Sequence, residues 1–113
     1  MHFDYSAAFS RNIGWVTRAE QEALRGKRVA IAGTGGVGGW YLLTLARLGV
    51  ERFTLAEFDT FDLVNFNRQA GANVATLGRP KLDVMVEQAL AINPGLDIRR
   101  FPAGVSSDNV TEF

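Results

Sequence analysis

The sequence predicts an α/β fold in which helices flank a parallel β-sheet. Three observations predict it. Strand-like and helix-like segments alternate along the 113 residues, the first predicted strand leads straight into a glycine-rich loop, and 47% of the residues are hydrophobic, which is enough to bury a core. That length suits one domain. Because 12 basic residues balance 12 acidic ones, the composition indicates neither nucleic-acid binding nor a membrane surface.

The first 27 residues are predicted to form an N-terminal arm followed by a short helix. Residues 3–16 show no clean helical or strand period, which favours an irregular arm. Thr17 and Glu20 have the spacing of a capping box, in which each side chain satisfies a free amide of the first helical turn. The helix is therefore expected to begin there, to run to about Leu24 and to close at Gly26.

A strand and a helix surround the glycine-rich loop. Residues 28–32 form a short apolar run with β-branched members, which predicts a buried parallel strand. Residues 36–48 are apolar on most faces, so they predict a helix covered on several sides. Gly49 is a suitable C-cap for that helix.

The second half of the chain repeats the pattern. Residues 52–58 predict a second strand, and residues 60–78 show no period, so this long segment is expected to be functional. Pro80 suits the first position of a helix that ends at residues 93–95, and residues 97–101 predict a third strand. Ser107 or Asp108 would cap a further helix. The order of elements predicts a Rossmann-like parallel sheet.

The glycine-rich loop carries the strongest local signal. Its glycines, at positions 33, 35, 36, 38 and 39, lie between a predicted strand and a predicted helix. Glycine lets the backbone turn sharply and approach a phosphate, while the helix N-terminus favours negative charge. Glu57 follows Gly33 by 24 residues, at the end of the second strand, where a carboxylate accepts ribose hydroxyls. These features leave NAD, FAD and ATP open.

A polar block after the second strand narrows the choice. It contains Asp59, Asn65, Asn67, Arg68 and Gln69, and Lys81 follows at the start of the next helix. A dinucleotide oxidoreductase has no use for this block. Arg and Lys donors aimed at a phosphate stabilise the charge that builds there during reaction. The block therefore favours an enzyme that acts on a phosphate of its nucleotide.

From about Arg11 to the end, the sequence resembles the ThiF/MoeB/HesA superfamily, which includes the ubiquitin-activating enzymes. The resemblance rests on the glycine loop, the run Asn67-Arg68-Gln69 and the run Gly78-Arg79-Pro80-Lys81, in this order and spacing. It implies an ATP- and Mg²⁺-dependent adenylyltransferase. Such an enzyme activates a carboxylate as an acyl-adenylate and releases pyrophosphate. The expected carboxylate is, for instance, the C-terminus of a ubiquitin-like or sulfur-carrier protein.

The resemblance also implies a role for each residue of the site. Arg68, Lys81 and Arg11 are expected to be catalytic, with Lys81 steadying the α-phosphate and Arg11 reaching the ATP of a partner subunit in a homodimer. The residues expected to contact the nucleotide are Gly33, Gly35, Gly36, Gly38, Glu57, Asp59, Asn65, Asn67, Arg68 and Lys81. The family usually has Asp where this chain has Glu57.

Two other interpretations remain open: a nicotinamide-binding oxidoreductase domain, and a non-catalytic partner subunit of the same superfamily. We expect residues 1–113 to be the N-terminal, ATP-binding portion of an incomplete adenylation domain that is inactive alone, with its Mg²⁺ ligand beyond the last residue. No metal ligand is assigned within the chain. Without a signal peptide or an apolar run that could span a membrane, a cytoplasmic protein is expected.

Overall fold

The computed structural model describes residues 2–113, which form a three-stranded parallel sheet and a set of helices. In chain order the elements are α1 (Tyr5–Ala8), the 3-10 helix η1 (Ser10–Asn12), α2 (Arg18–Gly26), β1 (Arg28–Ala32), α3 (Gly36–Leu48), β2 (Arg52–Ala56), the 3-10 helix η2 (Leu63–Asn65), α4 (Lys81–Ile92) and β3 (Asp97–Phe101). The predicted fold class is confirmed.

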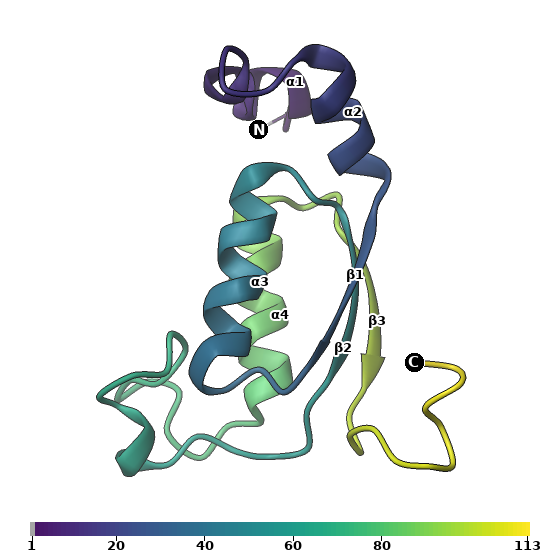
Figure 1. Cartoon of the computed structure of the whole chain (residues 1–113). Helices are drawn as coiled ribbons and strands as arrows, with labels where there is room; N and C mark the ends of the chain where they lie inside the picture. Colours follow the sequence, from purple (N-terminus) through teal and green to yellow (C-terminus); the bar gives the residue numbers. More distant parts are fainter. Residues whose placement is uncertain (1) are drawn as a thin grey trace.

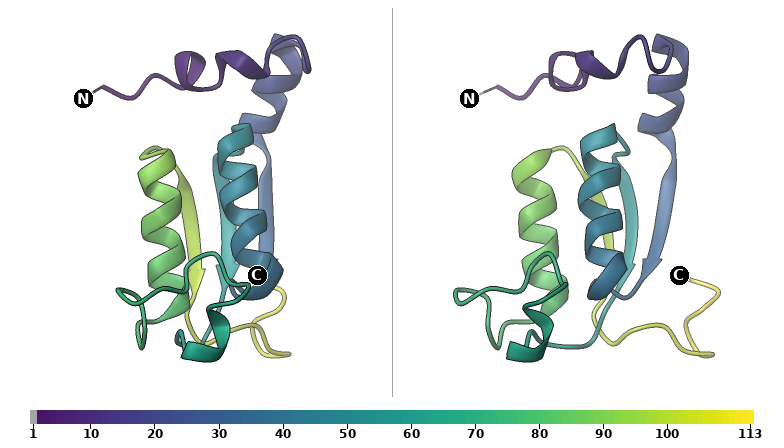
Figure 2. Two further views of the ribbon diagram at one scale, coloured as in Figure 1. Left: turned by 90° about the vertical axis from the view of Figure 1, so that its left-hand side faces the viewer. Right: turned by 60° about the vertical axis from the view of Figure 1, so that its left-hand side comes forward.

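The sheet has the order β1-β2-β3, and both neighbouring pairs are parallel. Helices α3 and α4 lie side by side against the same face of this sheet (Figures 1 and 2). Each parallel connection therefore crosses over through one helix, as a βαβ unit requires. Strand β1 lies at one edge, beside α3.

The expectation that β1 is buried is only half right. Ile31 points into the core, whereas Ala30 and Ala32 are exposed. Successive side chains of a strand point to opposite faces of the sheet, and within residues 2–113 the helices α3 and α4 cover one face only. A short apolar run therefore predicts a strand buried on both faces, even when helices cover only one face of the sheet.

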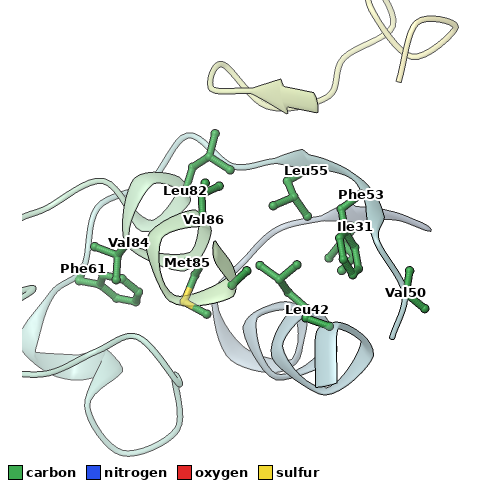
Figure 3. Close-up of a cluster of buried hydrophobic side chains, with 12 residues drawn as sticks. Ile31, Leu42, Val50, Phe53, Leu55, Phe61, Leu82, Val84, Met85 and Val86 are labelled. Carbon is green, nitrogen blue, oxygen red and sulfur yellow. The ribbon is translucent and has the colours of Figure 1, made fainter. Parts of the chain in front are cut away.

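The core lies between the helices and the covered face of the sheet (Figure 3). Phe53 and Leu55 of β2, Leu42 of α3 and Met85 of α4 are fully buried there. Phe61 extends this core beneath the segment that follows β2. The buried apolar side chains of α4 form the surface through which this helix packs on the sheet.

The N-terminal arm is more ordered than its sequence suggests. The capping box of Thr17 and Glu20 is present and begins α2. Residues 3–16, however, contain α1 and η1, with Tyr5 and Phe9 buried against each other. The prediction of an irregular arm was wrong because helices of one turn are too short to show a period.

Polar side chains attach this arm to the C-terminal end of α3. The hydroxyl of Tyr5 donates to the carbonyl of Gly49 over 2.6 Å, and Asn12 and Gln21 both donate to the carbonyl of Leu48. These bonds satisfy carbonyls that a helix end leaves free. Burial of the hydroxyl raises the pKa of Tyr5. The arm thus lies at the end of α3 remote from the glycine loop (Figure 1).

The further helix expected after Ser107 or Asp108 is absent, and residues 107–112 form turns. The side chain of Asn109 accepts a hydrogen bond from the Ser106 amide and donates to the Gly104 carbonyl. This side chain competes locally with helical bonding, as is typical of Asn. None of the helices between residues 2 and 113 has the length and hydropathy needed to cross a bilayer.

Candidate functional site

The glycine loop, the end of β2 and the start of α4 lie together at the carboxyl edge of the sheet (Figure 1). The Gly33 amide donates to the Ala56 carbonyl over 2.7 Å, which joins the loop to the end of β2. The Lys81 amide donates to the Asp59 carbonyl over 2.9 Å, which joins that strand end to α4. Ligands of open α/β sheets bind at this edge.

The surroundings of three loop glycines differ, and two of the three positions require glycine. Gly33 has a φ of +93°, a conformation that favours glycine. A Cβ on Gly38 would lie 1.8 Å from the Gly33 carbonyl oxygen, so only glycine lets α3 pack this closely on the loop. Gly36 faces open space. Because no side chain caps the N-terminus of α3, its first-turn amides are free to bind an anion.

The carboxylate of Glu57 holds the loop to the end of β2. Its Oε1 accepts from the Thr34 amide over 2.8 Å, and its Oε2 accepts from the amides of Phe58 and Asp59 over 3.1 Å each. An ionised carboxylate offers about four acceptor positions. Glu57 therefore fixes the geometry of the site, and its predicted bond to ribose stays a prediction.

Lys81 is a buried cation without a close anionic partner. Its side chain is only 8% exposed, and Nζ lies 3.8 Å from Oδ2 of Asp59 and 5.8 Å from the centroid of the Phe61 ring. The Asp59 side chain is itself 62% exposed. Burying a charge is costly unless it is well paired. The ammonium group is therefore able to donate hydrogen bonds to a closer anion, such as a phosphate. Arg79, two residues earlier, is instead paired with Glu87.

The segment 62–69 forms a compact turn beside the glycine loop. Asn65 is buried, and its Oδ1 accepts from the Asp62 amide over 2.8 Å, so it shapes η2. The Arg68 guanidinium donates to the Val64 carbonyl and to Oδ1 of Asn67 over 2.9 and 3.0 Å. Both Arg68 and Asn67 are exposed. Their contacts with phosphate stay predictions.

A hollow of about 420 Å³ adjoins the loop. Gly33, Gly36 and Gly38 line one part of it, and the rest runs along β1 and α3 past Tyr41. No group of three or more acidic, histidine or cysteine side chains arranged for a metal occurs among residues 2–113.

Arg11 lies far from these groups. It belongs to η1, and the neighbouring Asn12 is bonded to the Leu48 carbonyl at the C-terminal end of α3. The glycine loop lies at the other end of this 13-residue helix, roughly 20 Å away. An arginine side chain does not span that distance, so Arg11 is not part of the site of its own chain.

Two residues of the site carried no separate prediction. Thr34 is buried, and both its amide and its hydroxyl contact Glu57. Gln69 is 8% exposed and lies against Gly35. A threonine between glycines gave no sequence signal. Gln69 belonged to the predicted polar block, but an uncharged side chain gave no reason to assign it a role of its own.

A glycine loop at the N-terminus of α3, a carboxylate at the end of β2 and a buried lysine form the arrangement expected of a Rossmann-like nucleotide site. The family model described as "ThiF family" matches residues 9–113. The chain belongs to the ThiF family, which confirms the predicted resemblance.

Two curated relatives illustrate the range of the family. The tRNA threonylcarbamoyladenosine dehydratase of Bacillus subtilis is 40% identical over 90 residues, which cover 80% of this chain and 35% of that protein. The molybdopterin-synthase adenylyltransferase of Salmonella typhimurium is 37% identical over 93 residues, which cover 82% of this chain and 37% of that protein. This chain thus spans about a third of the length of these relatives.

A solved structure extends the comparison to the fold. The crystal structure of E. coli TcdA, a tRNA N6-threonylcarbamoyladenosine dehydratase, in complex with ATP has a TM-score of 0.90 with this chain at 29% identity. The match covers 95% of this chain and 44% of that one.

Proposed function

We propose that this chain supplies the ATP-binding half of a site that adenylates a carboxylate. The observation that carries the proposal is Lys81, a buried cation at the end of β2 whose contact with the exposed Asp59 carboxylate is long, at 3.8 Å. Membership of the ThiF family and the likeness to TcdA with ATP support it.

In the proposed reaction, a carboxylate oxygen attacks the α-phosphorus of ATP. A new P–O bond forms, the bond from the α-phosphorus to its bridging oxygen breaks, and pyrophosphate leaves with that electron pair. The free amides of α3 would donate hydrogen bonds to phosphate oxygens, and the Glu57 carboxylate would accept hydrogen bonds from ribose hydroxyls. Lys81 and Arg68 would donate to phosphate oxygens that gain charge in the transition state.

Magnesium, when bound to such a site, supplies neutralisation of the triphosphate charge. Among the residues expected to bind the nucleotide, Asp59 has an exposed carboxylate, which lies 3.8 Å from Nζ of Lys81. This carboxylate would be available to hold the metal. A single carboxylate does not make a magnesium site.

The acceptor is proposed to be the C-terminal carboxylate of a ubiquitin-like or sulfur-carrier protein, as the likeness to adenylyltransferases suggests. A second candidate is a carboxylate on modified tRNA, favoured by the 40% identity to a tRNA threonylcarbamoyladenosine dehydratase. Both acceptors would use the same chemistry at the α-phosphate.

Pyrophosphate release by the natural full-length protein tests this proposal. The protein would be mixed with ATP and either a sulfur-carrier protein with a free C-terminus or tRNA bearing threonylcarbamoyladenosine. Release with one acceptor, and not with its amidated or unmodified counterpart, is expected. ATP binding without release in the presence of either acceptor would favour a non-catalytic subunit instead.

The position of Arg11 predicts action across a homodimer. Mixing Arg11→Ala subunits with Lys81→Ala subunits should restore activity, because each mixed dimer would contain one site with both residues intact. Random pairing is expected to give about a quarter of wild-type turnover. Activity no higher than that of either variant alone would contradict action in trans. Arg18→Ala, which replaces an exposed arginine at the start of α2, is the matched control and should leave turnover unchanged.

A further inference from the structure

Gln69 is an unusual residue of the segment beside the glycine loop. Its side chain is more than nine-tenths buried, and its Oε1 is the only buried side-chain oxygen or nitrogen between residues 2 and 113 without a hydrogen-bond partner. Buried polar atoms are nearly always paired, and an unpaired one costs stability. The unpaired Oε1 of Gln69 is therefore a cost to the stability of the fold at this position.

The carboxamide of Gln69 lies flat against Gly35, the N-cap residue of α3. A Cβ built on Gly35 would lie 3.2 Å from both Nε2 and Oε1 of Gln69 and 3.3 Å from its Cδ. The neighbouring Gly36 has nothing within 4 Å of the same position. Of these two glycines, only Gly35 has a tight neighbour, the end of the Gln69 side chain, which would have to shift slightly to admit a Cβ.

A second contact holds the same segment to α3. The indole Nε1 of Trp40 donates to the Arg68 carbonyl over 2.9 Å. The Gln69 amide donates to the Asn65 carbonyl, so the main chain of Gln69 is also fixed. Gln69 and Trp40 together join the segment 65–69 to the first turn and a half of the helix whose free amides face the anion site.

We propose that Gln69 is a positioning residue: its buried carboxamide sets the place of Gly35, and thereby of the first-turn amides of α3, for the nucleotide. A Cβ on Gly35 would crowd Gln69, in addition to the usual reason for a glycine at such a position, which is close approach of the phosphate. This inference rests on the proposed nucleotide site.

A double-mutant cycle on the natural full-length protein tests it. Gly35→Ala, Gln69→Ala and the double variant would be compared by calorimetry with ATP and by thermal unfolding without ligand. Gly35 has ψ of −116°, which disfavours any side chain, but this cost is present in both backgrounds and cancels in the cycle. We expect Gly35→Ala to weaken ATP binding about 10-fold in the wild type and less than about 3-fold when Gln69 is Ala. Gly36→Ala is the matched control, because Gln69→Ala should not alter its effect.

Gln69→Met separates a positioning role from a merely structural one. Met keeps the volume and removes the unpaired oxygen, so the unliganded melting temperature should stay the same or rise. Because Met replaces the planar carboxamide that packs on Gly35 by a flexible thioether, ATP should bind about 10-fold more weakly. A lower melting temperature with unchanged ATP affinity would make Gln69 a structural residue and overturn the proposal. Effects of Gly35→Ala that are equal in both backgrounds would overturn it as well.

The wild-type titration distinguishes this inference from the proposed function. If the protein binds NAD and not ATP, the adenylation proposal fails, and the same cycle measured with NAD still decides the role of Gln69. If wild type binds neither nucleotide, both proposals are wrong.

Discussion

Replacement of Lys81 by Ala is expected to lower the rate of adenylation by about 10²–10³-fold, the loss typical of removing one donor to a charge that develops in the transition state. ATP affinity should fall much less, because that charge is absent from the ground state. Arg68→Ala should behave in the same way. Turnover would be measured by pyrophosphate exchange, and affinity by calorimetry. Equal losses in affinity and turnover would contradict the assigned roles.

Two further variants control for other effects of removing Lys81. Lys27→Ala removes the only other lysine of the chain, which is exposed and caps the end of α2, and it should leave turnover unchanged. Lys81→Met keeps most of the apolar stem that is buried beside Phe61. If Lys81→Met retains wild-type turnover, the stem matters and the ammonium group does not.

Replacement of Gly38 by Ala is expected to destabilise the protein by about 3 kcal/mol, at the upper end of the cost of overpacking. The new Cβ would lie 1.8 Å from the Gly33 oxygen and 3.2 Å from Cγ2 of Ile31. A backbone carbonyl cannot rotate away as a flexible side chain does, so the loop itself must shift. The free energy of unfolding from urea titrations would show the loss, and ATP binding should decline with it.

Gly36→Ala is the matched control for Gly38→Ala. It lies in the same turn of α3 with nothing within 4 Å of the added Cβ, and Ala favours a helix over Gly by up to about 1 kcal/mol. The control should therefore be as stable as the wild type or more stable. If both variants unfold at the same urea concentration, Gly38 is not needed for packing.

Local patterns predicted most of the fold. The bounds of β1 and α3 follow from a short apolar run, an all-round apolar helix and a glycine C-cap, and β3 has the range predicted for the third strand. Gly49 has a φ of +101°, as a left-handed C-cap requires. The second strand ends at Ala56, two residues before the predicted end, because Glu57 turns its carboxylate onto the loop.

The rest of the fold depends on contacts between distant residues, which one sequence does not reveal. The buried state of Tyr5 comes from its bond to Gly49, 44 residues away. The exposure of Ala30 depends on which helices cover the second face of the sheet. Likewise, Gln69 and Gly35 are each ordinary in sequence, and only their contact makes the unpaired oxygen visible.

The sequence indicated which residue types belong to the candidate site, but it did not indicate how these residues contact one another. Glu57, Asp59 and Lys81 are joined by the contacts of the strand end, and their roles toward a nucleotide stay predictions. Arg11 was predicted to act from a partner subunit, and its place at the far end of α3 supports that prediction. Asn65 has its oxygen bonded to Asp62, a local role that the spacing did not indicate.

Calorimetric titration of the natural full-length protein with ATP and with NAD tests the central claim most directly. The buried, weakly paired Lys81 and the free amides of α3 predict that ATP binds more tightly than NAD, and that Lys81→Ala weakens the preference less than it slows turnover. Tighter binding of NAD than of ATP would contradict the claim that this glycine loop belongs to an adenylating site.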